Sequence, residues 1–206
     1  MSMRKSLARL RSGDLFTPEG PKSSALRWSD LYRDKAGRIG KQLSKCAEVL
    51  GEIQHGETVH IVSMGEWSAE HVICHVAEQI GPCDLLMATW SVSNDAVLRL
   101  AQVMEAGHVR SCRALLDWRV KVRRPEALQI LRTALLTTDL YLSNCHGKVY
   151  LMANDEWAVS WVGSPNLTTN PRIEASVLTE GREVHNFHAT WINGCIDRAK
   201  PFEAED

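Results

Sequence analysis

The amino-acid sequence predicts an α/β fold in which helices flank a mixed central β-sheet. From residue 58 onward, strand-like runs alternate with segments of helical period, which is the pattern of a sheet with helices packed on it. Two further strand-like runs at 147–163 are separated by a short polar turn and add an antiparallel pair. A chain of 206 residues, 44% of them hydrophobic, is long enough to bury the core of such a layered fold.

The alternating part is expected to contain four strands and three helices. Helices are expected where apolar residues recur at three- and four-residue spacing, and strands where short apolar runs stand between turn residues. Gly81-Pro82 and Gly107 end two helices, and Pro125 suits the first turn of a third. The expected order is strand 59–64, helix 67–80, strand 84–90, helix 94–105, strand 111–117, helix 125–136 and strand 139–145.

A hairpin, one more strand and a closing helix are expected to follow. The runs GKVYLMA and WAVSWVG are strand-like, and Asn154-Asp155-Glu156 between them suits a turn. Residues 174–180 have the pattern of a strand, and residues 183–199 that of a helix.

The segment 1–57 is expected to form a basic arm and a helix in front of the layered domain at 58–206. Prolines and glycines before residue 27 favour an arm that is mobile or draped over the surface. Ser29 or Asp30 can cap a helix that runs to about Ile53.

The charge is nearly balanced over the whole chain but uneven along it. The net charge of −1 does not indicate a protein that binds nucleic acid by its overall charge. Residues 1–49 nevertheless hold eleven Lys and Arg against five Asp and Glu, and residues 110–132 hold seven against two. These patches either steer an anion or are solvated faces balanced elsewhere.

The cysteines and the apolar runs indicate a cytoplasmic protein without a membrane span. No Cys-x-x-Cys occurs and several cysteines lie in apolar segments, so reduced thiols are expected. No apolar run is long enough for a helix that crosses a membrane, and the basic N-terminus lacks the apolar stretch of a secretory signal. The cysteines are Cys46, Cys74, Cys83, Cys112, Cys145 and Cys195.

Two short motifs, His146-Gly147-Lys148 and Gly163-Ser164-Pro165-Asn166, carry the candidate chemistry. A His and a Lys two apart on a strand would point to the same face. The imidazole can attack phosphorus and the ammonium can neutralise a phosphate. Ser164 and Asn166 can donate hydrogen bonds to phosphate oxygens, and backbone N–H groups would join them if a helix begins near Ser164. Together the motifs make half of a phosphate-handling site.

The order of these motifs resembles the signature of the phospholipase D superfamily, His-x-Lys-x4-Asp followed by Gly-Ser-x-Asn. Residues 146–174 read HGKVYLMANDEWAVSWVGSPNLTTNPRIE, and the end of this stretch also resembles nuclease-like members. Ala153 stands where the signature has Asp, and Asp155 lies two residues further on. The resemblance implies a phospholipase D-like layered fold and a catalytic domain at 58–206, with no cofactor.

The resemblance also implies a homodimer. Phospholipase D-like enzymes protonate the leaving oxygen with a second His from a second copy of the motif, and no other histidine of this chain has a Lys two residues later. A two-fold axis through the site would supply the second His146 as the acid, with both Lys148 residues on the phosphate. Glu174, which matches an acidic residue of relatives, would hydrogen-bond an imidazole and fix its tautomer.

No metal site is expected. The sequence has neither a carboxylate cluster suited to Mg²⁺ nor paired Cys and His at zinc spacing. His71 and His75 are four apart near Cys74, but they do not form His-Glu-x-x-His, so a structural or surface role is favoured.

Nucleic acid, either DNA or RNA, is the expected substrate because relatives with one motif are mostly nucleases. Trp118 lies among the basic residues, where a core or rim role is favoured over stacking on a nucleobase. Other tryptophans in apolar strand-like runs are expected to pack: Trp90, Trp157 and Trp161. The residues expected to hold the nucleic-acid backbone are Arg119, Lys121, Arg123 and Arg124.

Two other functions stay open for the same fold: a catalytically silent nucleic-acid-binding or adaptor module, and a phosphatidyl or other phosphodiester transferase. A serine nucleophile at Ser164 is disfavoured, because Gly-Ser-Pro-Asn lacks the second Gly of a nucleophile elbow and no triad order supports it.

Overall fold

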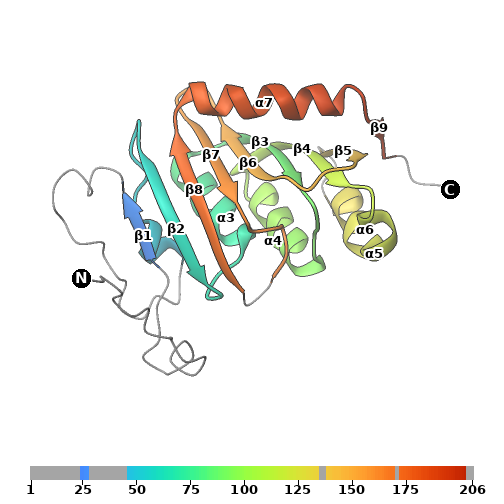
Figure 1. The fold of residues 1–206 in the computed structure, drawn as a ribbon, viewed down its shortest axis with the longest axis horizontal. Coiled ribbons are helices and arrows are strands. Elements are labelled where there is room, and N and C mark those ends of the chain that lie inside the picture. Colours follow the sequence, from blue (N-terminus) through green and yellow to red (C-terminus); the bar gives the residue numbers. More distant parts are fainter. Residues whose placement is uncertain (1–23, 28–45, 135–137, 170–171, 203–206) are drawn as a thin grey trace, which may run out of the picture.

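The computed structural model describes residues 24–27, 46–134, 138–169 and 172–202. Over these residues the chain forms one nine-stranded sheet with helices on both faces (Figure 1), which confirms the predicted α/β class. The strands are β1 (Ser24–Arg27), β2 (Thr58–Met64), β3 (Cys83–Thr89), β4 (Val109–Asp117), β5 (Thr138–Ser143), β6 (Lys148–Ala153), β7 (Ala158–Gly163), β8 (Ile173–Glu180) and β9 (Lys200–Pro201). The helices are α2 (Cys46–Leu50), α3 (Ala69–Ile80), α4 (Asn94–Glu105), α5 (Val120–Arg123), α6 (Pro125–Ala134) and α7 (Arg182–Ile196).

The sheet is mixed, as predicted, with strand order β1-β2-β8-β7-β6-β3-β4-β5-β9. β3, β4 and β5 are parallel to one another, and helices make the crossovers between them. β6, β7 and β8 form an antiparallel meander, and β6 joins it to β3. The two halves of the sheet therefore meet at the β3–β6 pair.

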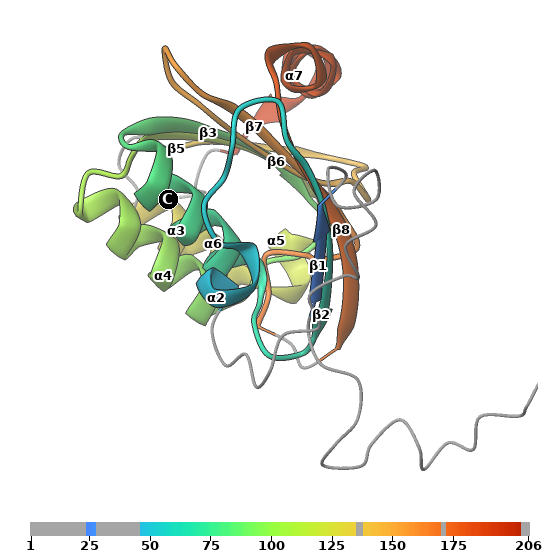
Figure 2. The same cartoon turned by 90° about the vertical axis from the view of Figure 1, so that its left-hand side faces the viewer.

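Both faces of the sheet are covered. Among the described helices, α7 lies alone on one face and α2 to α6 lie on the other (Figure 2). Along β6, Tyr150 and Met152 belong to the larger core under α2 to α6, whereas Val149 and Leu151 belong to the smaller core under α7. Burial on both faces explains why this strand is a nearly continuous apolar run.

The hairpin predicted between the two strand-like runs is confirmed as β6 and β7. Asn154 closes the turn, because its side-chain Oδ1 accepts hydrogen bonds from the backbone N–H groups of Glu156, at 3.0 Å, and Trp157, at 2.8 Å. Asparagine commonly stabilises turns in this way, by hydrogen-bonding to backbone groups a few positions ahead.

Most predicted elements are confirmed within a few residues, and the differences occur at their ends. α3 begins at Ala69 because Ser68 has the extended backbone of an N-cap. The closing helix ends at Ile196, short of residue 199, and β9 follows it beside β5. The short helix α5 was not predicted.

The described parts of segment 1–57 join the sheet and the core. Ser24–Arg27, predicted as part of an arm, pair antiparallel with β2. Leu50 at the end of α2 and Ile53 after it are buried in the larger core. The rest of the predicted arm and helix, at 1–23 and 28–45, lies outside the described residues.

All six cysteines are free thiols. Within the described ranges, no helix has both the length and the apolar character needed to cross a bilayer.

Candidate active site

The five residues expected to be catalytic lie at one end of the antiparallel meander. β6 and β7 pair with Val149 opposite Val162, so the start of β6 lies beside the end of β7. β7 and β8 pair with Gly163 opposite Ser176, so the start of β8 lies there too. This topology gathers the loop before β6, the segment after β7 and the first residues of β8. These carry His146, Lys148, Ser164, Asn166 and Glu174.

His146 and Lys148 are in contact, but not for the predicted reason. His146 lies in the loop before β6, which begins at Lys148, so the alternation of a shared strand does not apply and that prediction is wrong. Instead Lys148 Nζ donates to the carbonyl of His146 at 2.9 Å and lies 3.2 Å from its Nδ1. His146 is exposed, and burial lowers the pKa of Lys148. The pair is an accessible imidazole with a cation beside it.

Ser164 is bound to β8 by both its side chain and its backbone. Its hydroxyl donates to Glu174 Oε2 and accepts from the N–H of Ala175 at 3.1 Å. Its own N–H donates to the carbonyl of Ala175 at 2.9 Å. No helix begins at Ser164, so the expected cluster of free helix N–H groups is not there. The Ser164 hydroxyl serves to orient the Glu174 carboxylate.

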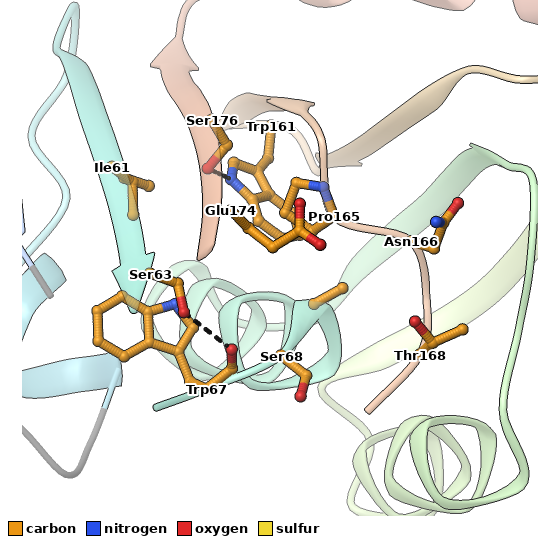
Figure 3. A pocket seen from close by; sticks show the side chains of 11 residues that line it. Ile61, Ser63, Trp67, Ser68, Trp161, Pro165, Asn166, Thr168, Glu174 and Ser176 are labelled. Atoms are coloured by element: carbon orange, nitrogen blue, oxygen red, sulfur yellow. Dashed lines mark hydrogen bonds between the residues drawn. The ribbon is translucent and has the colours of Figure 1, made fainter. Parts of the chain in front are cut away.

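Asn166 is one of the residues that line a small pocket, together with Trp67 and Glu174 (Figure 3). Its Oδ1 is buried and has no hydrogen-bond partner among the described residues. The pocket has a volume of about 10 Å³, room for roughly one water molecule. A buried amide oxygen without a partner is stabilised by an ordered water or by a hydrogen-bond donor of a ligand. At this volume the pocket is too small for a nucleobase.

Trp90, which was predicted to pack in the core, faces the site. It directly follows β3 and is half-buried, with its ring centroid 5.3 Å from that of His146 and 6.0 Å from Lys148 Nζ. Its indole N–H is buried and finds no acceptor within the described part of the chain. By contrast, Trp161 is 2% exposed and Trp157 packs against the larger core, as predicted.

The four basic residues predicted to bind nucleic acid lie in and around α5, which follows β4. The guanidinium carbons of Arg119 and Arg123 each lie 5.8 Å from the centroid of the Trp90 ring. Arg124 joins Arg123 in lining an open cleft. Lys121, on the same short helix, is exposed. The structure therefore brings two of the four cations next to the His146–Lys148 pair through Trp90.

Asp117 connects α5 to the loop that carries His146. The Asp117 side chain is buried at the end of β4. Arg119 donates to it from Nε at 2.6 Å, from Nη2 at 2.9 Å and from its backbone N–H at 3.0 Å. The backbone N–H of Cys145 also donates to it, at 3.2 Å. Burial raises the pKa of Asp117, but these hydrogen bonds outweigh burial and hold it below its usual value.

Asp117→Asn is expected to destabilise the protein by about 2–4 kcal/mol, because an amide offers one acceptor oxygen where the carboxylate binds four donors. The lowered pKa means that the wild type loses this stabilisation as the pH falls below the unfolded-state pKa of about 3.8, whereas the variant does not. Urea unfolding at neutral and acid pH measures both effects.

Asp139→Asn is the matched control. Asp139 pairs with Arg113 at 3.8 Å, but its side chain is 65% exposed. This substitution should cost less than about 1 kcal/mol. Equal costs for the two variants would refute a structural role of the Asp117 network.

Sequence reasoning missed Trp90 and Asp117, although one signal was available. Trp90 follows β3 and Asp117 ends β4, and these strands are parallel neighbours. Sites in α/β sheets gather outside the carboxyl ends of parallel strands. Polar and aromatic residues at those two ends were therefore candidates.

Asp155 lies away from the site. It is in the turn at the opposite end of the β6–β7 hairpin, where Arg182 donates to its backbone carbonyl. Ala153, where the signature has Asp, is the last residue of β6 and lies at the same end of the hairpin.

The histidine pair on α3 makes protein contacts. His71 Nδ1 accepts from the N–H of Ser68 at 3.2 Å, and His75 Nε2 lies 2.9 Å from the carbonyl of Gly51. Across the residues that the structure describes, no group of three or more His, Cys, Asp or Glu side chains is placed to hold a metal ion.

The sequence matches no protein-family model and no curated protein. The structure is similar to Nuc of Salmonella typhimurium, a phospholipase D family member, with 16% identity, a TM-score of 0.53 and coverage of 65% of this chain and 90% of that one. It is also similar to NucT from Helicobacter pylori, with 11% identity, a TM-score of 0.54 and coverage of 88% and 99%. Polyphosphate kinase from Porphyromonas gingivalis matches with 10% identity, a TM-score of 0.51 and coverage of 72% of this chain and 27% of that one.

These likenesses are all below 25% identity, so they show the α/β fold alone. The chain has the fold of the phospholipase D superfamily. Because a polyphosphate kinase also matches, the fold by itself does not select a reaction, and the function has to be argued from the site.

Proposed function

We propose that this chain is a metal-independent phosphodiesterase that cleaves DNA or RNA through a phosphohistidine intermediate. The observation that carries the proposal is the exposed His146 imidazole with Lys148 Nζ 3.2 Å from its Nδ1, at one end of the meander. An imidazole and an ammonium together supply a nucleophile and a phosphate-neutralising charge. Two of the nearby arginines, which contact Trp90, extend the positive field to the flanking backbone.

In the first step the Nε2 lone pair of one His146 attacks phosphorus and the bond from phosphorus to the leaving oxygen breaks. The His146 of the second copy donates its proton to that oxygen. In the second step that His146 takes a proton from water, the water oxygen attacks phosphorus, and the phosphorus–nitrogen bond breaks to restore the first imidazole. Both Lys148 ammonium groups hold the non-bridging oxygens throughout.

Substrate binding is expected to rearrange the His–Lys pair. A charged Lys148 can only donate, so a neutral His146 accepts at Nδ1 and keeps its proton on Nε2. The attacking imidazole needs a free lone pair on Nε2, so its one proton must be on Nδ1. The imidazole that acts as the acid carries protons on both nitrogens. Both roles therefore need a proton on Nδ1. Lys148 must therefore turn from Nδ1 to the phosphate, and Glu174 is the proposed acceptor for the Nδ1–H.

Two copies are proposed to share one site, because the scheme needs a second His and the chain has one His-x-Lys. Ile173, the residue before Glu174, is 58% exposed. An exposed isoleucine beside the site offers apolar surface for a second copy to cover. The proposal assigns the enzyme to the cytoplasm, where six free thiols stay reduced.

A catalytically silent nucleic-acid-binding module is the second candidate. The observation that favours it is Ala153 at the end of β6, which has no carboxylate where the signature has Asp, while Asp155 lies two residues further on in the turn. A silent module keeps the basic residues around α5 and binds without producing cleavage products.

The test is incubation of the wild type with single- and double-stranded DNA and RNA in excess EDTA, beside His146→Ala. Cleavage by the wild type alone, undiminished by EDTA, supports the His-based phosphodiesterase and identifies its substrate. Binding without products at any pH supports the silent module instead. Cleavage that EDTA abolishes would overturn the metal-independent scheme.

A further inference from the structure

Two apolar side chains, one just before α5 and one within it, are exposed beside the site. Trp118 is 53% exposed and Val122 is 73% exposed. The N–H of Lys121 donates to the carbonyl of Trp118 at 3.2 Å, so Trp118 lies in the turn that leads into α5. Val120 between them is 2% exposed and anchors the turn in the core. The exposure of Trp118 excludes the core role considered for it and leaves the rim role and stacking on a nucleobase.

Trp118 is connected to the reaction centre by ring contacts. The Arg119 guanidinium carbon lies 5.8 Å from the Trp118 ring centroid and also 5.8 Å from that of Trp90. The Trp90 centroid is 5.3 Å from that of His146. One guanidinium and one indole ring therefore bridge the space between Trp118 and the proposed nucleophile.

Hydrogen bonds tie the turn that carries Trp118 to the ends of β4 and β5. Arg119 makes two side-chain bonds and one backbone bond to the buried carboxylate of Asp117. The N–H of Trp118 donates to the carbonyl of Ser143 at 2.9 Å, which fixes the turn to the end of β5. These bonds fix the backbone at Trp118 and the neighbouring Arg119 side chain, so less of the binding surface has to be ordered when a ligand binds.

We propose that Trp118 is a stacking platform for one nucleobase of a single-stranded nucleic acid, near the phosphate that His146 contacts. The proposal rests on the phosphodiesterase function and names its substrate class. Base–aromatic stacking beside arginines is the usual way in which proteins bind single strands. The charge around the platform suits this ligand, because four cations lie at positions 119 to 124 and the one carboxylate paired with them there, Asp117 on Arg119, is buried.

A base in an intact duplex is stacked on its neighbours and has no free face for Trp118. The platform therefore selects unpaired strands, or frayed and looped segments of a duplex. A second copy of the chain is a weaker fit for this surface, because a two-fold contact centred on α5 would bring the same cations together.

The experiment measures binding by fluorescence anisotropy with labelled DNA oligonucleotides, in EDTA and in a His146→Ala background so that the strand stays intact. Trp118→Ala is expected to weaken single-strand binding about 5- to 150-fold, which corresponds to the loss of one stacked base. Trp118→Phe should keep most of the affinity. Phe187→Ala, which removes another exposed aromatic residue at 68% exposure on α7, should leave it unchanged.

A series of oligonucleotides with one abasic position each locates the contact. With the His146→Ala protein, removing the base at one position should weaken binding as much as Trp118→Ala does. With Trp118→Ala added, removing the base at that same position should not weaken binding further. Equal affinity of Trp118→Ala and its parent would overturn the platform, as would a change of oligomeric state that accounts for the whole loss.

The platform and the phosphodiesterase can fail separately. Stacking without cleavage by the wild type rejects the enzyme and keeps the platform. Cleavage with no effect of Trp118→Ala rejects the platform and keeps the enzyme. The absence of binding to any single strand, together with no cleavage of any single- or double-stranded substrate, rejects both.

Discussion

Replacing His146 with alanine is expected to lower phosphodiester cleavage by at least about 10⁴-fold. In a shared site the substitution removes both the nucleophile and the acid, and general acid catalysis alone accounts for about 10²–10⁴-fold. The loss should come without unfolding, because the side chain is exposed and contacts Lys148 and the Trp90 ring at the surface of the site. Initial rates on the substrate found in EDTA measure the effect.

Mixed dimers test whether the site is shared. When subunits of wild type and His146→Ala exchange freely in equal amounts, about a quarter of the dimers contain two wild-type copies. Activity should then follow the square of the wild-type fraction. A linear dependence would show that each copy works alone, and binding of uncleaved strand by His146→Ala serves as the control for folding.

Gly163→Ala is expected to destabilise the protein by about 3 kcal/mol or more. A Cβ at this position would lie 2.3 Å from the Cβ of Ser176, 2.5 Å from the carbonyl oxygen of Ala175 and 2.6 Å from the Cα of Ser176. Two of these atoms are backbone, so β8 itself would have to move away from β7. Because β8 carries Glu174, the variant should lose activity along with stability.

Gly194→Ala is the matched control for that substitution. Gly194 lies in α7, and its added Cβ would meet only the end of Arg198 at 4.0 Å. Alanine favours the helix over glycine, so this variant should range from unchanged to about 1 kcal/mol more stable. Urea unfolding compares the two variants, and a Gly163→Ala protein as stable as the wild type would show that β8 is free to shift.

The order of the elements could be predicted because each has a local signal. α4 runs from Asn94 to Glu105 as predicted, since Ser93 precedes its first turn and Gly107 lies shortly after its end. By contrast, α5 and β9 are too short for any period to show in the sequence. Their positions depend on what they pack against.

The sequence predicted which motif residues form the candidate site better than it predicted how their side chains contact one another. The motif residues come together because β6 and β7 form the hairpin that the sequence indicates. The conformation of His146 was not predictable, because whether a strand begins at residue 146 or 148 is decided by pairing with β3, which starts at Lys148. The Asp117–Cys145 contact joins positions 28 apart, so it depended on the parallel pairing of β4 and β5.

The pairing of β1 with β2 has a consequence for the solution behaviour of the protein. In the sheet order, β2 would be an outer strand if residues 24–27 were removed. Its backbone N–H and C=O groups on that side would then be unpaired, and such an edge recruits strands from other molecules. With β1 in place, the outer strand on this side has four residues in place of the seven of β2, and a short edge strand is a poorer template for such pairing.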